Sequence, residues 1–212
     1  MPYERQRPAT IAWSSELEQY RPIFEAAVAE CIGVLPSLKL YLAGNEDNFF
    51  DYKDVDANLR DALFIRDTWT IDAHRIASEI SSNNEKYELG EIVVIFTKQK
   101  ISGSQDSPYA CFNSHAGIIS LEHCSTEREL KEAASVSLRY ILGCIYQGKG
   151  KLHCDDADCI VQAMGSHESI LQFYEASAGR SGFCEKCRQA IRNGRMWYGD
   201  SPSRITRERH YC

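Results

Sequence analysis

The sequence predicts a single α/β fold, and three observations carry this prediction. The 212 residues are 43% hydrophobic and 25% charged, a composition that suits one sizeable core and excludes a disordered, collagen-like or coiled-coil chain. Short apolar runs alternate along the chain with segments of helical periodicity, as in α/β proteins. A cysteine-rich part then follows this alternation at the C-terminal end.

Helix and strand alternate in the N-terminal part of the chain. Apolar residues recur at helical spacing over 14–31, and Pro22 is expected to kink this helix or mark a restart. Residues 38–43 predict a strand, because apolar and mixed positions alternate there. Residues 71–80 predict a further helix.

The strongest strand signal lies in the middle of the chain. Residues 91–97 form a nearly continuous, β-branched apolar run, which predicts a central strand buried on both faces. Residues 116–121 predict another strand, and 125–143 predict a long helix that begins with a polar cap. Shorter helices are expected over 167–176 and 185–193.

A boundary is expected near residues 148–151, which read Gly-Lys-Gly-Lys, so we predict an α/β core over 1–147 and a C-terminal subdomain over 148–212. The formal charge is -6, but eight basic and three acidic side chains follow residue 179. A basic segment with interleaved aromatic residues indicates either an RNA contact or a solvated surface that pairs with the acidic body. The candidate RNA contacts are Arg188, Arg192 and Arg195.

Membrane and secretory segments are not expected in this sequence. No window approaches the roughly 20 apolar residues that cross a bilayer, and the N-terminal residues lack the apolar run of a secretory signal. We therefore expect a cytoplasmic protein that makes no membrane contact.

Four of the nine cysteines form two close pairs. Four residues separate Cys154 from Cys159, and two separate Cys184 from Cys187. Such spacings let two thiolates in each pair converge on one tetrahedral ion, so the sequence predicts one structural zinc ion held by four cysteines. Two disulfides are the alternative, which a reducing compartment disfavours.

The order of these features resembles the archaemetzincins, zinc metallopeptidases of the metzincin group. The resemblance covers roughly residues 89–190 and rests on the buried strand, the long helix, the step His153-Cys154 and the two cysteine pairs. It implies a compact, metzincin-like mixed sheet with helices and a C-terminal subdomain stapled by a four-cysteine zinc site. In that family the long helix carries the motif H-E-x-x-H-x-x-G-x-x-H.

The catalytic half of the motif is degenerate in this chain. With Gly143 as the family's glycine, Val136 and Tyr140 stand in place of the two helical histidines. Ser137 replaces the general-base glutamate, and Tyr146 stands three residues after the glycine. These residues cannot supply the imidazole ligands and the carboxylate base. The resemblance therefore implies a fold that keeps the structural zinc and has lost the hydrolytic zinc.

Three functions are compatible with this loss. One is a metallopeptidase with rewired ligands drawn from His115, His153 or His167, and another is an inactive pseudopeptidase that binds a peptide or protein. The third is an enzyme that forms amide bonds between amino acids, with aminoacyl-tRNA as donor. By analogy with the small fungal arginine-containing cyclodipeptide synthases, its product would contain arginine.

We favour the third function on chemical grounds. An aminoacyl ester is already activated, so amide formation needs positioning and an oxyanion contact rather than a metal-bound hydroxide. The candidate catalytic residues are Glu132, Ser137, Tyr140, Tyr146 and His153. The candidate substrate contacts are Arg139 and Asp155. The basic C-terminal tail is the expected contact for tRNA.

Overall fold

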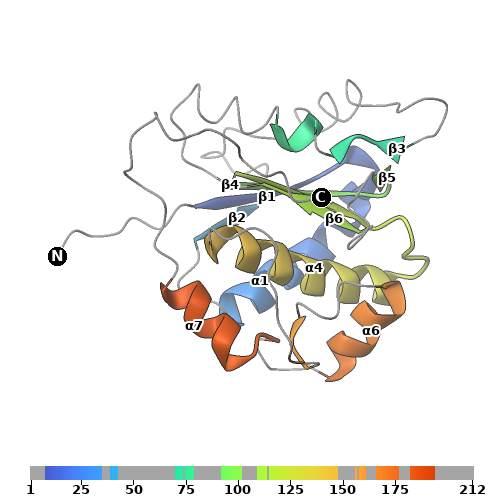
Figure 1. Cartoon of the computed structure of the whole chain (residues 1–212). Helices are drawn as coiled ribbons and strands as arrows, with labels where there is room; N and C mark the ends of the chain where they lie inside the picture. The colour runs from blue at the N-terminus through green and yellow to red at the C-terminus, as the bar shows by residue number, and fades with distance from the viewer. Residues whose placement is uncertain are drawn as a thin grey trace, which may run out of the picture.

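A computed structural model shows one main sheet above a layer of helices (Figure 1). The structure describes residues 8–34, 39–42, 70–73, 75–78, 92–101, 109–113, 115–147, 156, 158–160, 166–176 and 182–193. Within these ranges, no helix is both long and apolar enough to cross a membrane.

The main sheet has five strands in the order β2-β1-β4-β7-β6. At its centre, β1 (Ala9–Trp13) and β7 (Ala116–Ser120) flank β4 (Ile92–Thr97), and both pair with it in parallel. At one edge β2 (Leu40–Leu42) is parallel to β1, and at the other β6 (Ala110–Phe112) is antiparallel to β7. The predicted mixed sheet is therefore confirmed.

The three central strands are buried along their whole length, as expected for strands covered on both faces. This confirms the strand predicted at 91–97. The strand predicted at 116–121 is present as β7, and it is interior because β4 pairs on one side of it and β6 on the other. Neither β1 nor β6 was predicted. The run Ala-Thr-Ile-Ala-Trp after Pro8 was the available signal for β1.

A second, two-stranded sheet is formed by β3 (Thr70–Ile71) and β5 (Lys100–Ile101), which pair in parallel. The helical residues that follow β3 pack on the upper face of the main sheet. There Ala73 and Ile76 form a buried hydrophobic cluster with Ile95 of β4. Residues 73 and 75–78 are helical, within the helix predicted over 71–80.

Four α-helices lie on the opposite face of the main sheet in the described chain (Figure 1). A 3-10 turn, η1 (Ser15–Tyr20), leads into α1 (Arg21–Val34), so Pro22 marks the predicted restart. The other helices are α4 (Glu127–Gln147), α6 (His167–Ala176) and α7 (Glu185–Asn193). α4 packs against α1, α6 and α7, and α1 and α4 together cover the sheet.

The long helix α4 is the centre of the helical layer. A capping box starts it: the Glu129 backbone N–H donates to Thr126 Oγ1 at 3.2 Å, and the Thr126 N–H donates to the Glu129 carboxylate at 3.1 Å. The helix was expected to end at Gly143, but it continues to Gln147. Cys144 and Ile145 are buried, and this burial offsets the roughly 1 kcal/mol that a mid-helix glycine costs.

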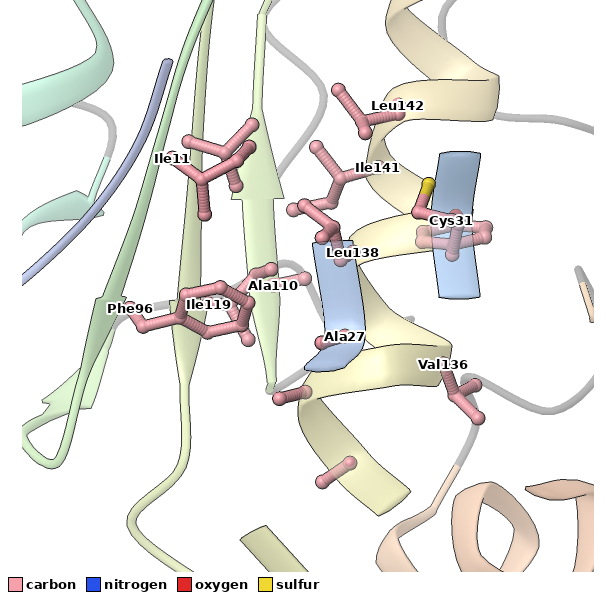
Figure 2. Close-up of a cluster of buried hydrophobic side chains, with 14 of the residues drawn as sticks. Ile11, Ala27, Cys31, Phe96, Ala110, Ile119, Val136, Leu138, Ile141 and Leu142 are labelled. Atoms are coloured by element: carbon pink, nitrogen blue, oxygen red, sulfur yellow. The ribbon is translucent and has the colours of Figure 1, made fainter. Parts of the chain in front are cut away.

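The main core lies between the sheet and the two helices α1 and α4 (Figure 2). Ile11, Phe96 and Ile119 from three neighbouring strands face Ile141 and Leu138 of α4. Every residue from 132 to 145 is buried, because the sheet, α1, α6 and α7 surround this part of α4. Polar side chains on the helix must therefore find partners inside the protein.

Candidate functional site

The first feature of interest is the cysteine cluster, formed by Cys159, Cys184 and Cys187. Cys159 lies in a turn in which its N–H donates to the Asp156 carbonyl at 3.0 Å, while Cys184 immediately precedes α7 and Cys187 lies in its first turn. The three Sγ atoms all lie within 4.8 Å of one another. The fold thus brings together three of the four ligands that the sequence predicted, and the fourth, Cys154, lies outside the described residues.

The cluster has the spacing and chemistry of a zinc site. A tetrahedral zinc ion with Zn–S bonds of about 2.3 Å places its sulfurs about 3.8 Å apart, and the Sγ atoms of Cys159 and Cys187 are 3.8 Å apart. An all-sulfur donor set is typical of a closed structural site rather than of a hydrolytic one. Among the described residues, these cysteines are the one group of three possible ligands that lie together.

The segment carrying Cys184 is fixed against the helical layer by Gly182. Its carbonyl accepts a 2.6 Å hydrogen bond from the Ile160 N–H, next to Cys159. Gly182 has φ of +76°, and a Cβ there would lie 3.0 Å from the Phe173 ring of α6 and 3.5 Å from Nη1 of Arg139. Glycine is therefore needed for both its backbone angle and its close approach to α6.

A second feature joins α1, α4 and α6, and we call it the helix-junction network: Glu30, Ser135, Arg139 and Tyr174. The Ser135 hydroxyl donates to Glu30 Oε2 at 2.5 Å, and the Tyr174 hydroxyl donates to Glu30 Oε1 at 3.0 Å. Arg139 lies one turn beyond Ser135, and its Nε donates to the Ser135 carbonyl at 3.2 Å. Three helices thus meet around one carboxylate.

Burial and charge both act on the helix-junction network. Burial lowers the pKa of Arg139, and Cys31, Glu30 and Tyr174 oppose this shift electrostatically. The pKa of Tyr174 is raised, first by burial and then by its hydrogen bond to Glu30. The raised pKa keeps the Tyr174 hydroxyl protonated, as a hydrogen-bond donor, over the neutral range. Arg139 is a cation because the arginine guanidinium does not lose its proton in proteins.

Glu132 was expected to act in catalysis, and the structure places it in an ion pair. Its buried carboxylate accepts a 2.7 Å hydrogen bond from Nε of Arg128, whose guanidinium also contacts the exposed Glu175 of α6. Glu132 also lies near Tyr174, since it contributes electrostatically to the raised pKa of that hydroxyl. It therefore borders the helix-junction network.

The other predicted catalytic residues on α4 are packed in the protein interior. Ser137 is 1% exposed and Tyr140 is 3% exposed. The Tyr140 ring packs edge-on against Phe112 of β6, with the ring centroids 6.2 Å apart. Val136, at the first family histidine position, is fully buried.

The predicted substrate and RNA contacts are dispersed. Arg139 belongs to the helix-junction network, whereas Arg188 is paired with Glu185 on α7 at 2.7 Å. Three further predicted site residues lie outside the described chain: His153, Asp155 and Arg195. For Tyr146 and Arg192 the structure describes the helical backbone and not the side chain.

Sequence reasoning did not identify Glu30, Ser135 or Tyr174. The serine was one of two in the same helix, and Ser137 was chosen because the metzincin motif pointed to it. Glu30 is separated from Ser135 by 105 residues and from Tyr174 by 144, so no local spacing connects the three. The available signal was Ser135 and Arg139 one turn apart in the otherwise largely apolar stretch 133–145 of the helix.

Comparison with known proteins connects this arrangement to one solved structure. The sequence matches no family model and no curated protein. The crystal structure of archaemetzincin from Methanopyrus kandleri is similar, with a TM-score of 0.60 over 92% of this chain and 98% of that chain. The chain has an archaemetzincin fold. The two sequences are 12% identical, so the likeness concerns the fold.

The archaemetzincin fold agrees with what the sequence features predicted for the architecture. The mixed sheet, the long helix beneath it and the C-terminal cysteine cluster follow in the expected order. The cysteine cluster is a group of ligands that could bind a metal ion, while the buried Val136 and Tyr140 of α4 contribute no imidazole ligand.

Proposed function

We propose that this chain is a metzincin-fold transferase that forms amide bonds between amino acids, uses aminoacyl-tRNA as donor, and makes an arginine-containing product. One observation carries the proposal: the two helix positions that the metzincin motif assigns to hydrolytic zinc hold Val136 and Tyr140, and both are packed in the core. A chain without these two zinc ligands does not hydrolyse peptides by the metzincin mechanism, and the fold can serve another reaction.

A rewired hydrolytic metal site is disfavoured by the placement of its candidate ligands. His115 immediately precedes β7, whereas His123 follows that strand. The ring of His167 lies 6.3 Å from that of His123, which places it at the far end of β7. Five strand residues at about 3.3 Å each separate the two ends, so His115 and His167 are too far apart to share one ion.

Zinc in the proposed enzyme is structural. Bound to the cysteine cluster, it would hold the turn at Cys159 against the start of α7 and thereby fix Gly182 over α6. The acyl chemistry needs no metal, because an aminoacyl ester carries its own activation. The RNA donor is expected to contact the basic C-terminal segment, which has eight basic and three acidic side chains after residue 179.

A second candidate is a peptide- or protein-binding pseudopeptidase, and the burial of α4 favours it. Ser137 and Tyr140 are at most 3% exposed, so neither reaches a substrate without rearrangement. A fold that is stabilised by zinc and keeps these side chains buried would bind a partner without catalysing a reaction.

Product analysis separates the two candidates. The purified, zinc-loaded full-length protein is incubated with a tRNA charging system and all amino acids, with and without ribonuclease, and small products are measured by mass spectrometry. The transferase yields an arginine-containing dipeptide or cyclodipeptide that ribonuclease abolishes. Absence of any dipeptide product contradicts the transferase, and a product that persists after ribonuclease contradicts the aminoacyl-tRNA donor.

A further inference from the structure

We infer that the helix-junction network is an acyl-transfer site in which Ser135 is the nucleophile and Glu30 is its base, acting on activated acyl esters. The inference rests on the proposed function for the identity of the acyl donor. The chemistry itself is argued from the side chains that meet between α1, α4 and α6.

The geometry is that of an activated nucleophile. A serine hydroxyl is a weak nucleophile unless a base within hydrogen-bond reach takes its proton and a third group orients that base. Ser135 Oγ lies 2.5 Å from Glu30 Oε2, and Tyr174 donates to the other carboxylate oxygen at 3.0 Å. Nucleophile, base and orienting group therefore stand in one hydrogen-bonded row.

Tyr174 and Arg139 are positioning residues in this site. Tyr174 fixes the Glu30 carboxylate in the rotamer that faces Ser135. Arg139 interacts electrostatically with Glu30 and Tyr174, and the residue is 4% exposed. The carboxylate form of Glu30 is the form that accepts the serine proton.

Access to the site runs through α6. Ser135 is fully buried, whereas Glu30 and Tyr174 are half-buried. The network therefore meets the surface at Glu30 and Tyr174, and an acyl group reaches Ser135 when neighbouring side chains of α6 move aside while Tyr174 keeps its hydrogen bond to Glu30. The ion pair between Arg128 and Glu132 lies on the same side, since Arg128 also contacts Glu175 of α6.

The proposed transfer balances without a metal or a redox partner. Ser135 Oγ attacks the acyl carbon, its proton passes to Glu30, the bond from the acyl carbon to the donor oxygen breaks, and Glu30 returns the proton to that oxygen. In the second half, an amine attacks the acyl-serine, the new C–N bond replaces the C–Oγ bond, and the amine proton passes through Glu30 back to Ser135. The enzyme ends in its starting state.

The test uses p-nitrophenyl acetate as the acyl donor and the zinc-loaded full-length protein. Release of p-nitrophenolate is followed in time, and the acetylated residue is located by peptide mass spectrometry. We expect a stoichiometric burst and an acetyl group on Ser135. Glu30→Gln should slow this acetylation by about 100-fold or more, the range in which general bases act.

Two variants control for folding and for position. Glu30→Gln keeps the size of the side chain and one acceptor oxygen, while its NH2 group can donate to the second hydroxyl. It therefore tests the base even where Ser135→Ala is unstable. Ser120→Ala removes a buried hydroxyl of β7, outside the network, and should leave acetylation of Ser135 unchanged. An unlabelled Ser135 in the wild-type chain, or equal labelling in Glu30→Gln, overturns the inference and leaves the network a structural tie between three helices.

The outcome is separable from that of the proposed function. Ester-dependent labelling of Ser135 without a ribonuclease-sensitive dipeptide keeps the acyl-transfer site and removes aminoacyl-tRNA as donor. A ribonuclease-sensitive dipeptide made equally well by Ser135→Ala keeps the proposed function and removes this site.

Discussion

Gly182 is the residue at which the cysteine cluster meets the helical layer. Its φ of +76° lies in a region that costs other residues about 1–2 kcal/mol, and an added Cβ would lie 3.0 Å from the Phe173 ring. Gly182→Ala should therefore lower the free energy of unfolding by about 2 kcal/mol, or the melting temperature by roughly 4–8 °C in a chain of this size.

The matched control is a glycine in a relaxed position. Gly33 lies in α1, and a Cβ there would meet nothing within 4 Å. Gly33→Ala should be neutral or stabilise the protein by up to about 1 kcal/mol. Equal effects of the two substitutions in calorimetry would contradict the role given to Gly182.

Two buried thiols should make the protein less stable in alkaline solution. Burial raises the pKa of Cys31 to about 12, and burial likewise raises that of Cys124 to about 12. In the unfolded chain these thiols ionise near pH 8.5–9. Above that pH the unfolded state binds fewer protons than the folded state, so stability falls as pH rises from about 9 towards 12.

Urea midpoints measured under reducing conditions at several pH values between 7 and 10.5 check this prediction. Cys124→Ala removes one of the two thiols and should flatten the alkaline decline relative to the wild type. A decline of the same slope in both proteins would assign it to other groups.

At the scale of elements, β7 and α4 approach closely at Gly117. A Cβ added there would lie 2.6 Å from Cγ2 of Ile141, a contact that requires the Ile141 side chain or α4 to shift. Gly117→Ala should cost about 1–3 kcal/mol, as overpacking usually does. Ile141→Ala removes Cγ2 together with Cδ1 and should make the loss smaller, and a double-mutant cycle by chemical denaturation measures that coupling.

The elements differ in how readily the sequence reveals them. β4, α6 and α7 could be predicted because each carries a continuous or periodic pattern of its own. β1 and β6 were missed because short strands are defined by the neighbours with which they pair. The end of α4 was missed because burial of Cys144 and Ile145 outweighs the local effect of Gly143.

The candidate sites also differ in whether their residues are close together in the sequence. The cysteine cluster could be predicted because the two cysteines of each pair are close in sequence. The only assumption needed was that the chain brings the second pair back beside the first. The helix-junction network could not, because Glu30, Ser135 and Tyr174 come from three helices with no common spacing. Ser137 was selected through the metzincin motif, yet the serine with a carboxylate partner is Ser135.

For the molecule as a whole, metal removal should loosen the C-terminal elements. Zinc binding and folding are coupled in cysteine sites, so a chelator or Cys187→Ser should lower the melting temperature and expose the amides of α7 to hydrogen exchange. Native mass spectrometry should show one zinc ion in the wild type. Cys124→Ala, outside the cluster, should retain that ion.

Two outcomes would contradict this assignment. Cys187→Ser with a full zinc ion and unchanged melting would remove the cysteine cluster as the metal site. A second zinc ion bound with comparable affinity would reveal ligands beyond the cluster and would return a metallopeptidase to consideration.

The distance in sequence between Glu30 and Tyr174 also determines when their hydrogen bond can form during synthesis. The carboxylate leaves the ribosome early, but the Tyr174 hydroxyl is made 144 residues later. At bacterial or eukaryotic elongation rates this delay is roughly 7–30 s, during which α1 has no hydrogen-bond partner from α6. Chains that terminate before α6 contain Ser135 but lack Tyr174 and the packing of α6 on α4, and are expected to be degraded by quality-control proteases rather than to accumulate.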